Sequence, residues 1–300
     1  MRDSYDVVVV GGGAAGLNGA LMLARSKRSV VVIDAGAPRN APADGVHGLL
    51  GHDGLPPAEL LRRGRAEVRS YGGEVIEGEV ETVSPGFTVT LTDGRTVGAR
   101  RLLVTTGLVD ELPDIPGLRE RWGRDVVHCP YCHGWEVRDR PIGVISSGPM
   151  SVHQALLFRQ LSDDVTFFTH TRPAPAAEDA AKLAHRGISI VDGEVAALET
   201  AGIRLADGTV HSVGAVAVAT RMVARAGFLE KLGLRPIEHP SGVGEYVPAE
   251  AAGRTDVPGV WVAGNITDLT AQVGASAAAG ALAGAAINAD LVTEEATPLP

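Results

Sequence analysis

The sequence predicts an α/β fold made of two Rossmann-like units, the second inserted into the first. A short β-branched run, Tyr5–Val10, is followed at once by glycines, by a helical segment, Ala14–Arg25, and by a second apolar run, Val30–Ile33. This order is that of a βαβ unit in a doubly wound parallel sheet. A second strand, turn and helix are predicted over Ile142–Leu157, so the pattern occurs twice.

A short internal repeat supports two related units. Leu91-Thr92-Asp93-Gly94 precedes a predicted strand over 102–106, and Leu205-Ala206-Asp207-Gly208 precedes one over 216–220. Each Asp-Gly is expected to turn a hairpin; two unrelated hairpins are the alternative. Prolines and glycines at 113–117 and 236–244 indicate linkers. The predicted layout is a first domain of 1–112 and 243–300, completed by a strand over 260–263 and a helix over 272–289, with 113–242 inserted.

Composition excludes several classes of protein. The chain has 300 residues, a net charge of −9 and 45% hydrophobic residues. An acidic chain without a basic cluster predicts no nucleic-acid partner, and this apolar content excludes disorder as the main state. The first apolar run is too short for a secretory signal. The uncharged stretch 273–289 is mostly Ala and Gly, which predicts no membrane span. We therefore expect a soluble, cytoplasmic protein.

The first glycine cluster has the pattern of a nucleotide site. Gly11-Gly12-Gly13-Ala14-Ala15-Gly16 fits G-x-G-x-x-G. In this motif the first glycine permits the tight turn, the second lets the backbone approach a pyrophosphate, and the third allows close helix–strand packing. Asp34 ends the next strand, where an acid accepts from ribose hydroxyls. The remaining residues predicted for this part of the site are Ala35, Arg39, Asn40, Thr106 and Gly107.

A C-terminal segment favours FAD over NAD as the ligand of this site. Gly264-Asn265 ends a predicted strand, and Gln272-Val273 opens a helix. A helix N-terminus facing a flavin stabilises the anionic reduced ring through its dipole. We therefore predict that Gly264, Asn265, Gln272 and Val273 contact FAD.

Cys129 and Cys132 form a C-x-x-C pair and are the only cysteines. Two thiols at this spacing can close a reducible disulfide, and a neighbouring histidine can carry the proton of the leaving thiolate. His133 follows the second cysteine and His128 precedes the first, so both are candidate acid–base groups. Half a zinc site, a structural disulfide and a glutaredoxin-like site are the alternatives; we predict no metal.

With these motifs the chain resembles the low-molecular-weight thioredoxin reductases over nearly its whole length. The resemblance implies the same two-domain fold, bound FAD and a homodimer. It also implies that Cys132 contacts the flavin and that Cys129 attacks the substrate.

Four features depart from that family's pattern. His133 stands where the family has an aspartate, and Asn265 replaces another aspartate beside the flavin. The second nucleotide motif begins Ser146-Ser147-Gly148 instead of three glycines, and the segment His170–Ala176 lacks two of the three arginines that grip the NADPH 2′-phosphate. Losing charge-assisted contacts to phosphate weakens binding, so NADPH is disfavoured as reductant. Drift in a reductase that uses NADH or binds its cofactor loosely is the alternative.

The segment Cys129–Glu136 is similar to the flavin dithiol oxidases of gliotoxin and holomycin biosynthesis. The expected activity is therefore FAD-dependent oxidation of a small-molecule dithiol to an intramolecular disulfide, with O2 as acceptor and H2O2 as product. The alternatives are an NAD(P)H-dependent thioredoxin or disulfide reductase and a flavin-binding redox sensor without turnover.

Overall fold

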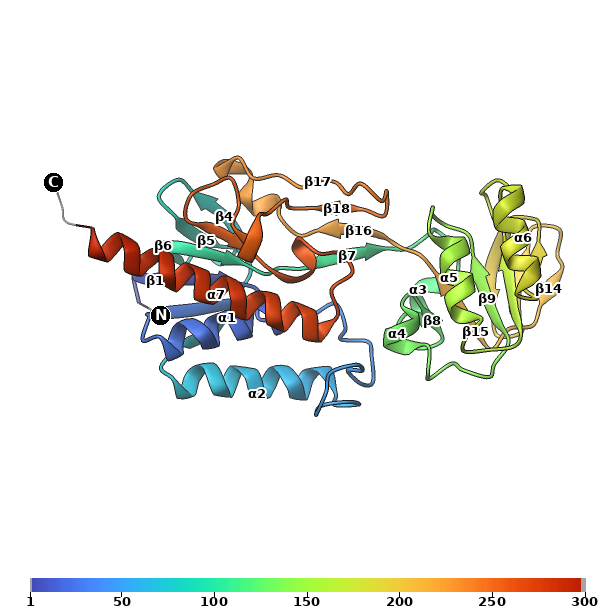
Figure 1. Cartoon of the computed structure of the whole chain (residues 1–300), viewed down its shortest axis with the longest axis horizontal. Coiled ribbons are helices and arrows are strands. Elements are labelled where there is room, and N and C mark those ends of the chain that lie inside the picture. The colour runs from blue at the N-terminus through green and yellow to red at the C-terminus, as the bar shows by residue number, and fades with distance from the viewer. Residues whose placement is uncertain (1, 298–300) are drawn as a thin grey trace. The chain divides into compact units, whose positions relative to one another are not determined.

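The computed structural model describes residues 2–297 and confirms the predicted α/β fold (Figure 1). It divides into two units. Unit 1 comprises the residues up to Val109, Val223–His239 and those from Gly244 onward, and unit 2 comprises Asp110–Met222 and Pro240–Val243.

The elements of unit 1 are β1 (Ser4–Val10), α1 (Ala14–Arg25), β2 (Val30–Asp34), α2 (Pro57–Ser70), β3 (Glu74–Glu77), β4 (Val80–Ser84), β5 (Thr88–Leu91), β6 (Thr96–Val104), η1 (Gly227–Leu232), β17 (Ile237–Glu238), β18 (Glu245–Tyr246), η2 (Ala251–Gly253), β19 (Val260–Val262), η3 (Gly264–Ile266) and α7 (Val273–Ala296). Those of unit 2 are α3 (Leu118–Arg121), β8 (Val126–Val127), α4 (Pro130–His133), β9 (Ile142–Ile145), α5 (Ser151–Phe158), β10 (Val165–Phe168), α6 (Ala177–His185), β11 (Ser189–Val191), β12 (Val195–Glu199), β13 (Gly202–Leu205), β14 (Val210–His211) and β15 (Ala215–Val218). The segments that connect the units carry β7 (Leu108–Glu111) and β16 (Arg221–Ala224), which pair with each other.

Unit 1 is built on a seven-stranded sheet in the order β3-β2-β1-β6-β5-β4, with β19 beside β6. The nine-residue β6 pairs antiparallel with β5 through its first half and parallel with β19 through its second half. Strands β3, β2, β1, β6 and β19 are all parallel. Their carboxyl ends therefore meet at one edge, which is where ligands bind in open α/β sheets.

Alternation along β1 fills the core on both faces of this sheet. Val7 and Val9 pack with α1 and with Ile287 of α7, whereas Val8 and Val10 pack with β4, β5 and Leu229 of η1. All four valines are buried, as expected for a strand covered on both sides.

Helix α7 lies along α1 (Figure 1) at a distance that only small residues permit. A Cβ on Gly280 would lie 1.9 Å from Ala15 O, and one on Gly284 would lie 2.6 Å from Gly19 O. By length and composition α7 is the one helix within residues 2–297 that could cross a membrane. Its glycine-mediated packing on α1 is that of a helix in a globular domain.

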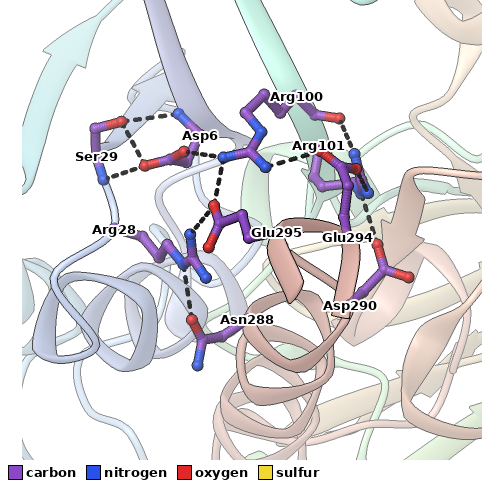
Figure 2. A network of polar contacts seen from close by, with 9 residues as sticks. All are labelled: Asp6, Arg28, Ser29, Arg100, Arg101, Asn288, Asp290, Glu294 and Glu295. Carbon is purple, nitrogen blue, oxygen red and sulfur yellow. Dashed lines mark hydrogen bonds and ion pairs between the residues drawn. The ribbon is translucent and has the colours of Figure 1, made fainter. Parts of the chain in front are cut away.

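The last turns of α7 are tied to the sheet by an ion-pair network (Figure 2). Arg100 of β6 donates to Asp6 at 2.9 Å, to Glu295 at 2.7 Å and to Glu294 at 2.8 Å. Arg28 also donates to Glu295, at 2.6 Å. The remaining members drawn in Figure 2 are Ser29, Arg101, Asn288 and Asp290.

This network predicts sensitivity of unit 1 to acid. Hydrogen bonds from Arg100 and Arg101 lower the pKa of Glu294, and those from Arg28 and Arg100 lower the pKa of Glu295. A carboxyl whose pKa is lower in the folded than in the unfolded chain stabilises the fold above its unfolded pKa, about 4.3 for Glu, and that contribution is lost as the pH falls further. We expect the thermal unfolding midpoint to drop between about pH 5 and pH 3. Arg100→Gln should flatten that drop, and an unchanged slope in this variant would contradict the assignment.

Unit 2 contains a five-stranded parallel sheet, β11-β10-β9-β15-β8, and a three-stranded antiparallel sheet, β12-β13-β14. Both predicted Asp-Gly turns are hairpins, one between β5 and β6 and the other between β13 and β14. The strand after the turn is continuous in unit 1 but broken in unit 2, where residues 212–214 separate β14 from β15. The related segments therefore build one sheet in unit 1 and two in unit 2.

The predicted boundaries differ from the observed units mainly in one segment, apart from residues 110–112 and 243, which were expected in the first domain and cluster with unit 2. Residues 223–239 were expected in the inserted domain but cluster with unit 1. Ala226, Leu229 and Leu234 of this segment are buried in the unit 1 core beside β4 and β5. Hydrophobic burial therefore assigns this segment to unit 1, although it follows the last parallel strand of unit 2 directly.

Candidate functional site

The glycine cluster forms a tight turn at the carboxyl end of β1. Gly11 has φ +104°, and a Cβ there would lie 2.6 Å from Thr105 O. The Thr105 hydroxyl donates to Gly11 O at 2.9 Å and to Val10 O at 3.0 Å, which fixes the turn against the end of β6. Gly16 lies so close to this turn that a Cβ would come within 1.9 Å of Gly11 O. Gly11 and Gly16 are therefore required by packing.

Gly13 differs, because nothing lies within 4 Å of the position of its Cβ. Its φ of −79° is open to any residue, and it is the N-cap of α1 without a side-chain capping hydrogen bond. The N–H groups of the first turn, which includes Ala14 and Ala15, therefore face an open cradle that an added side chain would fill. This arrangement fits the pyrophosphate of a dinucleotide such as FAD.

Asp34 ends β2 next to the glycine turn, since a Cβ on Gly12 would lie 2.5 Å from Asp34 Oδ2. Arg65 of α2 donates to that same oxygen at 2.7 Å, and the Gly36 N–H donates to Oδ1 at 3.2 Å. The carboxylate is thus held in place beside the cradle, where it can accept hydrogen bonds from the hydroxyls of a ribose. Arg65 belongs to no recognised motif, so the sequence did not predict its contact with Asp34.

The loop after β2 and the end of β6 are joined by one residue from a distant segment. Arg225 donates from its guanidinium to Ala37 O at 3.2 Å and from its N–H to Gly107 O at 3.0 Å. The Thr106 hydroxyl donates to Arg225 O at 2.6 Å. Of the other predicted contacts in this loop, Ala35 is exposed, and Arg39 and Asn40 are half-buried.

The end of β19 and the start of α7 lie at the same sheet edge. A Cβ on Gly264 would lie 3.0 Å from Ala15 Cβ and 3.6 Å from Ser276 Oγ. Asn265 Nδ2 donates to Asp268 O and Ala271 O, both at 2.9 Å, and so organises the turn that leads to Gln272. Helix α7 begins at Val273 with Gln272 as N-cap, without a side-chain capping hydrogen bond. The positive end of the α7 dipole can therefore stabilise an anionic reduced flavin ring. The Asn265 Nδ2 group already donates to backbone carbonyls of the protein.

In unit 2, Cys129 and Cys132 form a disulfide. Cys129 is the N-cap of the single-turn helix α4, and its Sγ accepts from the Cys132 N–H at 3.2 Å. Gly134 ends the turn in a buried position, where a Cβ would lie 2.2 Å from Pro130 O. Both cysteines are partly exposed. The disulfide is therefore accessible on a turn whose backbone also supports a Cys129 thiolate.

The two candidate histidines bracket this turn. His128 Nδ1 lies 3.3 Å from Val218 O, so the proton sits on Nδ1 and Nε2 is the basic nitrogen. His133 ends α4, with its N–H donating to Cys129 O at 3.1 Å. Buried Gln154 of α5 donates from Nε2 to His128 O at 2.7 Å; no motif predicted this residue.

The loop after β9 is closed by the side chain of Ser151, the first residue of α5. The N–H groups of Ser147 and Gly148 both donate to Ser151 Oγ, at 3.1 and 3.2 Å, and Ser151 Oγ donates to Gly148 O at 2.9 Å. Ser151 is 1% exposed, and Pro149 has no N–H to offer. The donors that a Rossmann turn presents to a pyrophosphate are therefore satisfied internally.

In the segment His170–Ala176, which lacks two of the arginines expected to bind a 2′-phosphate, the first side chain is also hydrogen-bonded within the protein. The Val195 N–H donates to His170 Nδ1 at 3.0 Å. Burial lowers the pKa of the His170 imidazole and outweighs the negative charge of Glu194, which raises it. His170 is therefore neutral and offers no positive charge to a phosphate. Thr171 and Arg172 are exposed.

The predicted site residues thus fall into two groups, the cofactor cradle of unit 1 and the disulfide turn of unit 2. Within residues 2–297 no group of three or more His, Cys, Asp or Glu side chains has the arrangement of a metal site.

Comparison with known proteins agrees with these features. Residues 5–285 match the family model "Pyridine nucleotide-disulphide oxidoreductase". The chain is 31% identical to thioredoxin reductase tcpT of Claviceps purpurea (strain 20.1), over 96% of this chain and 95% of that protein. Among solved structures, that of HlmI shares 45% identity with a TM-score of 0.91, covering 98% of this chain and 95% of that one. An oxidoreductase from Agrobacterium tumefaciens shares 34% identity with a TM-score of 0.92, covering 97% and 99%.

Proposed function

The chain belongs to the pyridine nucleotide-disulphide oxidoreductase family, and from that premise we propose that it is a flavin-dependent dithiol oxidase. It is a thioredoxin reductase-like enzyme of a family whose members bind FAD. The proposed substrate is a small molecule with two thiols, which the enzyme closes into a ring disulfide. O2 is the proposed electron acceptor and H2O2 the second product.

The observation that carries the proposal is the closed loop after β9. A reductase needs this loop to bind the pyrophosphate of NADPH or NADH, but Ser151 Oγ occupies the N–H groups of Ser147 and Gly148. The neutral His170 adds no charge for a 2′-phosphate. Electrons are therefore proposed to enter from the dithiol through the cysteine pair. The 45% identity with HlmI supports the same branch of the family.

The chemistry proposed for the cysteine turn is two successive thiol–disulfide exchanges. A substrate thiolate attacks Cys129 Sγ, the Cys129–Cys132 bond breaks, and Cys132 leaves as a thiolate. The second substrate thiolate attacks the sulfur bonded to Cys129, which releases the cyclic disulfide and the Cys129 thiolate. The Cys132 N–H donates to Cys129 Sγ and stabilises that leaving group.

His128 and His133 are proposed to take up the two protons of the substrate thiols. His128 suits this role through Nε2, because Val218 O fixes the proton on Nδ1. FAD, held by the cradle of unit 1, would supply the two-electron acceptor for the reduced cysteine pair and the reactivity with O2. The residues proposed to hold it are the predicted cofactor set of unit 1, with Arg65 and Arg225 as supports.

An anaerobic titration of the purified holoenzyme tests this function. A small dithiol such as dithiothreitol should bleach the flavin band near ~450 nm, whereas NADPH and NADH should leave it unchanged. Air should restore the band with one H2O2 for each disulfide formed. Ser146→Gly alters only the closed loop and should respond like the wild type.

Rapid bleaching by NADPH would instead establish a disulfide reductase, the second candidate. The names of tcpT and of other relatives as thioredoxin reductases favour that candidate. The predicted homodimer rests on the family resemblance and the predicted cytoplasmic location on the sequence composition, and both stay predictions.

A further inference from the structure

Gln154 is a buried amide beside the disulfide turn that no sequence motif explains. It lies on α5, is 6% exposed, and donates from Nε2 to His128 O at 2.7 Å. Because the acceptor is a carbonyl, the orientation of the carboxamide is fixed, with nitrogen toward His128. The bond holds the peptide that joins His128 to Cys129.

The other end of the carboxamide is unusual. Within residues 2–297, Gln154 Oε1 is buried and has no hydrogen-bond partner. Buried polar atoms are nearly always paired, so an orphan acceptor points to a group that arrives in another state of the site. Oε1 shares one planar group with Nε2 and therefore lies beside the same peptide. A thiol S–H of the cysteine pair, which exists only after reduction, is a donor of the kind that this acceptor lacks.

We propose that Gln154 is a positioning residue for the redox pair, which fixes the His128–Cys129 peptide and presents Oε1 to the reduced site. Gln154 at the carbonyl and Val218 at the ring would then both help to orient His128. The inference rests on the proposed function, because it assigns a role in opening and closing the same disulfide.

Two substitutions separate positioning from simple packing. Gln154→Leu keeps most of the volume but has neither donor nor acceptor. Gln154→Glu has the same shape and, when protonated, an O–H that can donate to His128 O while the second oxygen stays an acceptor. Burial raises the pKa of such a carboxyl. The Glu variant should therefore work at low pH and fail as the carboxyl ionises.

The experiment measures the rate of flavin bleaching by dithiothreitol against pH in both holoenzyme variants. We expect Gln154→Leu to be slower than wild type by about tenfold at every pH, the effect of one lost hydrogen bond to a buried group. Gln154→Glu should approach the wild-type rate at low pH and lose it on a limb at higher pH that the wild type lacks. Ser162→Ala is the matched control, because Ser162 is also buried and its hydroxyl donates to Arg140 O at 2.6 Å in the same unit. It should keep the wild-type profile.

The outcomes are distinct. Equal profiles of the Glu and Leu variants, or wild-type rates in both, would overturn the positioning role. If Gln154→Glu does not fold, Gln154→Asn, which keeps both polar atoms on a shorter chain, replaces it, and an Asn rate no better than that of Leu would likewise overturn the role. If Gln154→Leu does not fold, the pH profile of Gln154→Glu decides, and a profile without the limb at higher pH would overturn the role. Failure of the wild type itself to bleach with the dithiol would refute the proposed oxidase and not the role of Gln154, which can then be read from the reactivity of the reduced cysteines with a disulfide reagent.

Discussion

Replacing Cys132 by serine is expected to lower dithiol oxidation by about a thousandfold or more, because no disulfide remains for the substrate to attack. The fold should be retained, since Cys132 is partly exposed and its N–H, which donates to Cys129 Sγ, is unchanged. The remaining Cys129 thiol should react with one equivalent of 5,5′-dithiobis(2-nitrobenzoate). Peroxide release in the presence of a small dithiol is the measurement.

Two further variants make this result specific. Cys129→Ser should be equally inactive, because the attacked sulfur is gone. Tyr131→Phe changes the exposed residue between the two cysteines and keeps both thiols, so it should retain most of the activity. A serine variant of either cysteine that keeps more than a few per cent of the wild-type rate would show that the disulfide is not the redox centre.

Substitution of two glycines in one motif is expected to affect different properties, the stability of unit 1 for Gly16 and the affinity for FAD for Gly13. In Gly16→Ala the new Cβ would lie 1.9 Å from Gly11 O and 2.6 Å from Thr105 Oγ1, both fixed by the turn. Overpacking of this kind should destabilise unit 1 by about 3 kcal/mol. In Gly13→Ala the Cβ meets nothing within 4 Å, and the backbone tolerates it. That variant should fold normally but bind FAD about tenfold more weakly, as expected for lost contacts to a pyrophosphate.

Thermal unfolding of the flavin-free proteins and FAD titration separate these effects. Gly227→Ala is the control, since its Cβ also meets nothing within 4 Å and it lies outside the cradle. Wild-type FAD affinity in Gly13→Ala would place the pyrophosphate elsewhere, and a normal unfolding midpoint in Gly16→Ala would contradict the close packing of the turn.

Local patterns predicted the parts of the molecule that depend on neighbours in the chain. The β1–turn–α1–β2 unit and both Asp-Gly hairpins follow from hydrophobic spacing and glycine placement. The C-x-x-C spacing predicted the Cys129–Cys132 disulfide, which the turn of α4 closes.

Long-range contacts account for what the sequence could not predict. Arg65 reaches Asp34 of β2 from helix α2, and Arg225 reaches Ala37 from the segment of unit 1 that follows the inserted unit. The sequence shows a serine at 151, but only the fold places its hydroxyl on the two loop amides. Gln154 has the pattern of an ordinary helix residue, and only the fold shows that its Nε2 donates to His128 O.

The pairing of β19 with β6, and of α7 with α1, has a consequence for synthesis of the protein. The elements of unit 2 all lie within residues 110–222, so they leave the ribosome while the last strand and helix of unit 1 are still unmade. Because domains generally fold as units during synthesis, unit 2 can fold before unit 1, although unit 1 begins earlier in the chain. Until β19 and α7 are synthesised, β6 lacks its parallel partner β19, and the face of α1 that α7 covers stays exposed. A nascent chain stopped before α7 would therefore carry a finished cysteine turn and an unfinished flavin cradle.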